Sequence, residues 1–178
     1  MENKVLKGNL VYLTPMSYDD CEDFLRWRNS DFIKSFFIYR KDITLEEQKK
    51  WIREKVETGH VLQYIIWDRN ANKKIGCVYI QNIDRESKEA EFGILIGEQE
   101  YVGGGRGTES ARLLIDYAFE KLNLERIYLR VLKDNDRARR SYEKVGFVLE
   151  DADEIISIAG KEETVTFMSI KRAEFYYY

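Results

Sequence analysis

Four glycines within five residues, Gly103, Gly104, Gly105 and Gly107, lie between an apolar run and a helical pattern. Glycine lets backbone N–H groups approach a ligand closely and permits positive φ. The start of a helix adds unpaired N–H donors and about half a positive charge. The segment therefore suits a phosphate or pyrophosphate group, although a surface turn without a ligand explains glycines alone equally well. No Lys-Ser/Thr pair follows the glycines, and no dinucleotide-fold pattern precedes them, so two common phosphate motifs are excluded.

The composition limits the other kinds of chemistry. A chain of 178 residues corresponds to one domain, residues 1–178. Its single histidine, His60, excludes a histidine-cluster metal site, and we expect no metal. A net charge of −3 argues against a nucleic-acid binder. There is no long apolar run and no signal-peptide pattern, and Cys21 and Cys77 look like reduced thiols, so we expect a cytoplasmic protein that does not bind membranes.

Hydrophobic periodicity and capping residues predict the elements that must position the glycine loop. The expected order is β-α-α-β-β-β-α-β-α-β-β, which predicts an α/β (α+β) fold with a mixed, mostly antiparallel sheet and helices on both faces. The helix at residues 108–122 is a crossover, so its two flanking strands should be parallel. Strands are expected at residues 10–13, 61–67, 75–83, 90–96, 127–132, 155–158 and 164–170, and helices at residues 17–29, 44–59, 108–122 and 134–146.

Two sequence blocks carry a family resemblance. Residues 90–96 (AEFGILI) with residues 103–109 (GGGRGTE) resemble the acetyl-CoA signature of the GNAT N-acetyltransferase superfamily. Residues 134–147 (DNDRARRSYEKVGF) resemble its Asn-x-x-Ala-x-x-x-Tyr-Glu-Lys-x-Gly-Phe block, and the order and separation of the two blocks match. The early Trp27-x-Asn29 is similar to the subgroup of ribosomal-protein N-terminal, spermidine and amino-sugar-nucleotide acetyltransferases.

The resemblance implies a GNAT-like acyl-CoA acyltransferase fold and a cytoplasmic N-acetyltransferase that uses acetyl-CoA as co-substrate. The acetyl group would pass directly to a primary amine in a ternary complex. Val102 departs from the family pattern, since Gln or Arg is common at that position, so backbone donors must carry more of the pyrophosphate binding. The residues that the resemblance assigns to acetyl-CoA are Ile94, Leu95, Ile96, Gly103, Gly104, Gly105, Arg106, Gly107, Thr108, Asn135 and Arg139.

The resemblance also implies the catalytic groups. Tyr142 corresponds to the tyrosine that protonates the leaving thiolate, whereas periodicity alone would place it in the core. Glu91 is the candidate base, because removing a proton from an alkylamine at pH 7 costs roughly 4–5 kcal/mol. The apolar residues that follow it would favour a neutral carboxyl group that exchanges protons near neutral pH. A carboxylate that only binds backbone amides is the alternative.

The acceptor is less defined. Trp27, Asn29 and Phe36 are assigned to its binding site, although core packing explains Trp27 as well. A small-molecule or peptide amine would fit, such as a polyamine, a protein N-terminus, an amino-sugar nucleotide or an antibiotic. A non-catalytic module that binds CoA is the alternative function. The aromatic run at residues 175–178 indicates either an interface, such as that of a homodimer, or a frayed tail.

Overall fold

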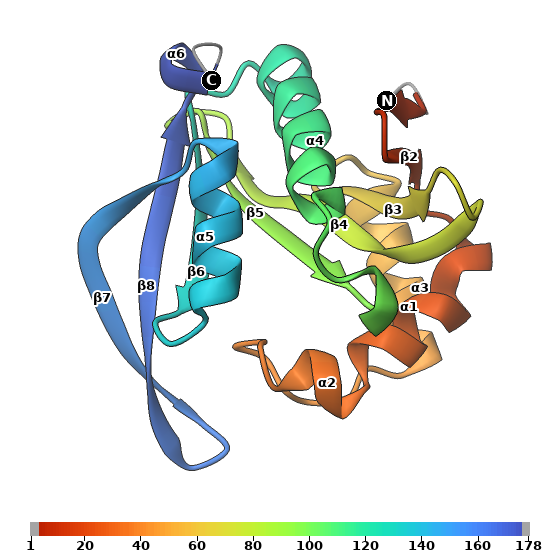
Figure 1. Cartoon of the computed structure of the whole chain (residues 1–178), viewed down its shortest axis with the longest axis horizontal. Coiled ribbons are helices and arrows are strands. Elements are labelled where there is room, and N and C mark those ends of the chain that lie inside the picture. Colours follow the sequence, from red (N-terminus) through yellow and green to blue (C-terminus); the bar gives the residue numbers. More distant parts are fainter. Residues whose placement is uncertain (1–3, 176–178) are drawn as a thin grey trace.

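The chain forms one eight-stranded sheet in the order β1-β2-β3-β4-β5-β6-β8-β7 (Figure 1). The structure is a computed structural model, and it describes residues 4–175. Neighbouring strands are antiparallel except for β5 and β6, which are parallel as the crossover predicts. The strands are β1 (Leu6–Lys7), β2 (Val11–Pro15), β3 (Leu62–Asp68), β4 (Lys73–Asp84), β5 (Glu89–Ile96), β6 (Arg126–Leu132), β7 (Val148–Ile158) and β8 (Lys161–Lys171).

Helices cover both faces of the sheet, which confirms the predicted fold class (Figure 1). One face packs against α4 and α5 through a core that includes Val78, Phe92 and Leu114. The other packs against α1 and α2 through a core that includes Trp27 and Cys77. The helices are α1 (Cys21–Arg28), α2 (Asp31–Lys34), α3 (Leu45–Trp51), α4 (Arg106–Leu122), α5 (Asp136–Val145) and α6 (Arg172–Phe175), with 3-10 turns at Tyr18–Asp20 and Gln99–Tyr101 and a π turn at Ile52–Val56.

Capping residues set the helix ends where the sequence predicts them. Thr44 and Glu47 form a reciprocal box, in which the Glu47 N–H donates to Thr44 Oγ1 at 3.2 Å and the Thr44 N–H donates to Glu47 Oε2 at 2.8 Å. Asn135 caps α5 by accepting the Ala138 N–H at 3.2 Å. Gly146 ends α5 with φ of 115°, a conformation that favours glycine.

Strands β5 and β6 pair over only three residues and then part. The paired positions are Glu89 with Arg126, Ala90 with Ile127 and Glu91 with Tyr128. No described residue of β5 beyond Glu91 pairs with β6. The far end of β5 is therefore open along one side, which leaves room for a ligand between the two strands.

The predicted starts of β7 and α4 are wrong, and α2 was not predicted. Strand β7 begins at Val148, not at residue 155, because its first half is exposed and interrupted by an irregularity between Leu149 and Asp153, so it carries no clear alternation. Helix α4 begins at Arg106, because Gly105 itself takes the N-cap position. The four-residue α2 is too short to show a period and is started by Ser30, whose hydroxyl accepts the Ile33 N–H.

Candidate active site

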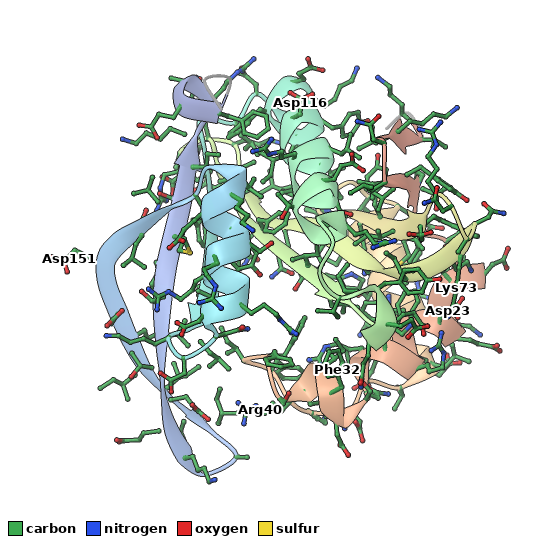
Figure 2. The ribbon with its side chains drawn as sticks, in the orientation of Figure 1. Asp23, Phe32, Arg40, Lys73, Asp116 and Asp151 are labelled. Carbon is green, nitrogen blue, oxygen red and sulfur yellow. The ribbon has the colours of Figure 1, made fainter. Side chains whose placement is uncertain are left out.

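A cavity of about 480 Å³ lies where β5 and β6 part. Its walls come from β5, from the glycine loop and start of α4, from α5, and from the segment that follows α1. Figure 2 labels two residues of that last segment, Phe32 and Arg40, and shows it below α5 and the end of β5. Of these two, Phe32 lines the cavity. The site thus gathers the regions in which the sequence predicted cofactor, acid, base and acceptor residues.

The glycine loop has the backbone geometry that its composition predicts. Gly103, Gly104 and Gly105 all have positive φ, at 95°, 62° and 86°. A Cβ atom on Gly107 would meet nothing closer than Ile94 Cδ1 and Ile96 Cγ1, each at 3.9 Å. Because Gly107 lines the cavity, its missing side chain leaves open space beside the first turn of α4. That space and the free N–H groups of the first turn fit the pyrophosphate of a CoA ester.

Thr108 and Ser141 connect the two helices beside this loop. Thr108 Oγ1 on α4 and Ser141 Oγ on α5 lie 3.2 Å apart, and both residues line the cavity. This contact holds the N-terminal end of α4 against α5. Ile94 and Ile96 on β5 also line the cavity, which agrees with the cofactor assignment of residues 94–96.

The side chain of Arg106 does not face the cavity, so its predicted contribution of charge to the phosphate site is wrong. Its Nε donates to Asp68 Oδ2 at 2.6 Å, and its guanidinium lies 5.3 Å from the centre of the Tyr101 ring. Burial alone would raise the pKa of Asp68, but hydrogen bonds from the Ala71 N–H and from Arg106 hold that pKa below its ordinary value. Arg106 therefore anchors the loop to the end of β3.

Arg139 is a second correction. Its Nη1 donates to the Lys133 carbonyl at 3.1 Å and lies 3.6 Å from Asp136, so the side chain turns back along its own helix and does not line the cavity. Its neighbours Arg137 and Arg140 do line it, together with Asn135. A helix turns by about 100° per residue, so only part of a basic run can face one ligand.

Tyr142 lies in the cavity wall. Its ring makes edge-on contacts with Phe92 and Phe147, at centroid distances of 6.2 and 6.0 Å. Burial raises the pKa of the Tyr142 phenol to about 12. The phenol therefore keeps its proton at neutral pH. Among the described residues its hydroxyl has no hydrogen-bond partner, so the O–H group is available to a ligand. Both expected properties, core packing and an accessible hydroxyl, are present together.

Glu91 also lines the cavity, on the opposite face of β5 from the ring of Phe92. Its surroundings are polar, so the expected apolar environment is wrong. Oε1 accepts from Arg130 Nε at 3.1 Å, and Oε2 accepts from Asn82 Nδ2 at 2.7 Å and from Gln81 Nε2 at 3.3 Å. Asn82 reaches Glu91 from an irregularity of β4, where its φ is 50°. These three partners come from neighbouring strands and leave no local signal in the sequence.

Of the three predicted acceptor residues, only Phe36 lines the cavity. Trp27 is 1% exposed, and its indole N–H donates to Glu98 Oε1 at 2.8 Å, so it is a core residue. The Asn29 side chain donates to the Ile43 carbonyl at 2.8 Å and accepts the Ile43 N–H at 2.9 Å. Asn29 therefore holds the segment that carries Phe36 and does not itself line the cavity.

Tyr79 is a cavity residue that the sequence analysis missed. It pairs with Gly93 across β4 and β5, and a Cβ atom on Gly93 would lie 2.2 Å from the Tyr79 ring. Gly93 thus leaves the space in which this ring lies flat over β5. A glycine inside a strand indicates such a close approach, so the signal was present in the sequence. Phe32, Phe37 and Tyr39 also line the acceptor side of the cavity.

Between residues 4 and 175 no group of three or more His, Cys, Asp or Glu side chains could hold a metal ion. Within the same range no helix is long and apolar enough to cross a membrane. Phe175 packs against Phe119 at a centroid distance of 5.6 Å, while Tyr176, Tyr177 and Tyr178, on which an interface was predicted, lie outside the described residues.

Comparison with known proteins gives consistent matches. The family model for the acetyltransferase (GNAT) domain matches residues 11–148. The probable N-acetyltransferase YjcK of Bacillus subtilis (strain 168) is 33% identical over 150 residues, which cover 80% of this chain and 83% of the relative. Spermidine N(1)-acetyltransferase of Escherichia coli (strain K12) is 32% identical over 126 residues, covering 64% of this chain and 67% of the relative.

A solved structure has the same fold. The spermidine N-acetyltransferase of Vibrio cholerae, in complex with CoA and spermine, superposes with a TM-score of 0.84 at 25% identity, covering 95% of this chain and 99% of that one. The residues of the family match include the cavity walls of β5, α4 and α5.

Proposed function

We propose a reaction for this chain from the premise that it belongs to the GNAT acetyltransferase family, as the match over residues 11–148 establishes. The protein is an N-acetyltransferase, and its proposed activity is direct transfer of an acetyl group from acetyl-CoA to a primary amine within a ternary complex. One observation carries the mechanism. A single cavity between β5 and β6 reaches Tyr142 on one face of the sheet and Glu91 on the other.

Acetyl-CoA supplies the acetyl group as a thioester, in which the carbonyl carbon accepts the lone pair of the amine and the sulfur leaves. The backbone N–H groups at the start of α4 are placed to hold its pyrophosphate, with Gly107 leaving the space. Thr108 and Asn135 line the same wall. Arg140 and Lys144 add positive charge on α5.

Tyr142 is the proposed general acid. With a pKa of about 12 its hydroxyl keeps its proton at neutral pH, and it lies in the wall beside the CoA-binding loop. Donation of that proton to the leaving sulfur avoids release of a free thiolate, and such general acid catalysis typically contributes 10²–10⁴-fold in rate.

Glu91 is the proposed base on the acceptor side. The approaching amine is mostly an ammonium ion at neutral pH, so a carboxylate that attracts it and takes its proton, directly or through water, lowers the barrier to attack. Arg130 and Asn82 hold the carboxylate in one orientation.

The cysteines support direct transfer without an acyl-enzyme. Burial raises the pKa of the Cys77 thiol to about 12, and burial likewise raises the pKa of the Cys21 thiol. Neither thiol forms the thiolate that nucleophilic catalysis needs at neutral pH. Both are buried, and neither lines the cavity.

The test is to measure thiol release from acetyl-CoA with a panel of amines. The panel includes spermidine because the relatives from Escherichia coli and Vibrio cholerae are named spermidine acetyltransferases. We expect amine-dependent thiol release that Tyr142→Phe reduces. A non-catalytic CoA-binding module is the alternative, and it would bind acetyl-CoA and release no thiol with any amine. The retained tyrosine hydroxyl favours the enzyme, because binding alone needs the glycine loop and not the acid.

A further inference from the structure

The acceptor side of the cavity contains little free negative charge. Glu91 is the one carboxylate among the described residues that line the cavity. Both of its oxygens already accept hydrogen bonds, from Arg130 on one side and from Asn82 and Gln81 on the other. The positive side chains that line the cavity are Arg130, Arg137, Arg140 and Lys144.

Arg28 adds a buried positive charge immediately behind this wall. The residue is only 4% exposed, and its guanidinium lies 4.8 Å from the ring centre of Phe37 and 5.7 Å from that of Tyr39, two cavity residues. Its Nη2 donates to the Tyr39 carbonyl, while its buried Nη1 has no hydrogen-bond partner. Within residues 4–175 no carboxylate lies within ion-pair distance of it. Buried charges in proteins are normally paired, so this one requires an explanation.

Arg137 limits access to the nearest acidic groups. A neighbouring pocket contains Asp134, Asp136 and Glu163, and Arg137 and Phe36 line both it and the main cavity. The guanidinium of Arg137 lies 4.9 Å from the centre of the Phe36 ring. A second ammonium group of an acceptor would have to pass this cation to reach the acids. Glu163 is also already paired, at 3.5 Å, with Arg40.

These charges discriminate between classes of amine. A polyamine brings two or more ammonium groups. Those beyond the reacting one would face Arg137 in the cavity, with Arg28 behind the wall of Phe37 and Tyr39, and would find no free carboxylate among the described cavity residues. Like charges in a partly desolvated cavity repel more strongly than in water. An anionic group on the acceptor would instead compensate the buried guanidinium. Burial lowers the pKa of Arg28, and the more distant carboxylate of Asp42, which is paired with Lys34, opposes this shift only in part.

We propose that the acceptor of this enzyme is a primary amine that also bears an anionic group, a carboxylate or a phosphate, and that polyamines are poor acceptors. The inference rests on the proposed acetyl transfer. Arg28 and Arg137 are the specificity-determining residues. Arg28 acts through the wall formed by Phe37 and Tyr39, and Arg137 acts at the boundary with the neighbouring pocket.

The experiment compares matched acceptors that differ in one charged group. Glucosamine is compared with glucosamine 6-phosphate, phenylalaninamide with phenylalanine, and spermidine serves as the polycation. We expect kcat/KM to be at least tenfold higher for the anionic member than for the neutral member of at least one pair, through a lower KM. For spermidine we expect kcat/KM to be below that of the neutral members. The pair that shows the larger ratio distinguishes a phosphate from a carboxylate.

Variants then test the assignment to the two arginines. Arg28→Met should reduce the ratio of kcat/KM for the anionic acceptor to kcat/KM for its neutral partner about tenfold, and Arg28→Lys should keep part of that ratio. Arg137→Met should also reduce the ratio, and it serves as the test if Arg28→Met does not fold. Arg53→Met removes an equal charge from a side chain that is 63% exposed and should leave the ratio unchanged. Acetyl-CoA affinity is measured for each variant, so that a loss of phosphate contacts to CoA is recognised separately.

Two results would overturn the inference: spermidine as the preferred acceptor, or equal kcat/KM for both members of every pair. If no amine releases thiol, the proposed function fails. The inference can then still be tested by calorimetric binding of the same pairs to the protein saturated with CoA. Equal affinity within each pair would reject it.

Discussion

Arg130 on β6 binds Glu91 on β5 just beyond the point where these parallel strands stop pairing. The Nε–Oε1 distance is 3.1 Å, and the last ladder pair is Glu91 with Tyr128, two residues before Arg130. The ion pair therefore bridges β5 and β6 where the two strands begin to part. It holds a carboxylate that is only 6% exposed in one position and keeps the two strand ends at a defined separation.

Gly107→Val should weaken acetyl-CoA binding without unfolding the protein. The added side chain has no close neighbour within the protein, since the nearest atoms to its Cβ lie at 3.9 Å, so it would occupy the space assigned to the cofactor. We expect the dissociation constant, measured by calorimetry, to rise by at least about tenfold, equal to about 1.4 kcal/mol.

Glu120→Val is the matched control for Gly107→Val. It places the same β-branched residue on an exposed position of α4 that does not line the cavity. Its acetyl-CoA affinity should equal that of the wild type. If the folded Gly107→Val protein also binds acetyl-CoA normally, the glycine loop is not the pyrophosphate site.

Tyr142→Phe should reduce the single-turnover rate by about 10²–10⁴-fold with little change in acetyl-CoA affinity, because it removes the proton donor and keeps the ring. The ring contacts with Phe92 and Phe147 do not involve the hydroxyl. Tyr12→Phe is the control, since its hydroxyl bonds only Asn72, at 2.7 Å on another part of the sheet. A wild-type single-turnover rate in Tyr142→Phe would assign Tyr142 to packing alone.

The pH dependence of stability should report the buried phenol. The folded-state pKa of Tyr142 is about 12 and the ordinary value is 10.0, so above pH 10 the unfolded chain loses this proton while the folded chain keeps it. The stability of the wild type relative to Tyr142→Phe should therefore be constant below pH 10. Between pH 10 and pH 12 it should fall, by up to about 2–3 kcal/mol. The measurement is the denaturation midpoint of both proteins across this range. If the difference in stability between the wild type and Tyr142→Phe stays constant up to pH 12, the pKa of Tyr142 is not raised in the folded protein.

The order of the longer elements and the parallel pair could be predicted because each depends on local patterns, and the family block predicted Tyr142, which lies in the cavity wall. The side chains of Arg106 and Trp27 could not, because their partners, Asp68 and Glu98, are 38 and 71 residues away. Glu91 shows the same limit. Its apolar neighbours in the sequence point away on alternate positions of the strand or lie further along it, while its polar partners come from β4 and β6.

Asn29→Ala should destabilise the protein and leave chemistry largely unchanged at temperatures where it is folded. The substitution removes two hydrogen bonds to the backbone of Ile43 and leaves those groups without the amide. The expected loss is about 1–3 kcal/mol in the free energy of unfolding. Asn9→Ala, at an exposed position, is the control. An unchanged stability with a raised acceptor KM would restore Asn29 as a direct substrate contact.

Glu91→Gln tests whether the carboxylate takes the proton of the amine. Glutamine keeps the shape, but its single oxygen can accept either from Arg130 or from Asn82 and Gln81, so one of these contacts is lost. It also cannot act as a base at neutral pH. We expect kcat/KM to fall by about 10²–10⁴-fold at pH 7. As the pH rises, the variant should recover part of this loss, because more of the acceptor is already a neutral amine.

The pH profile separates this role from a structural one. For an acceptor whose amine has a lower pKa, the Gln variant should lose less activity at pH 7, because less deprotonation is required of the enzyme. A purely structural carboxylate would give the same fold loss for amines of every pKa and at every pH. Arg130→Met provides the second measurement, since it removes the partner of Glu91 and keeps the carboxylate. If Glu91 is the base, Arg130→Met keeps the pH profile of the wild type, whereas the rate of Glu91→Gln relative to the wild type rises with pH. If both variants show the wild-type profile with only a uniform decrease, the proton leaves to solvent water and Glu91 serves to hold β5 and β6 at the mouth of the cavity.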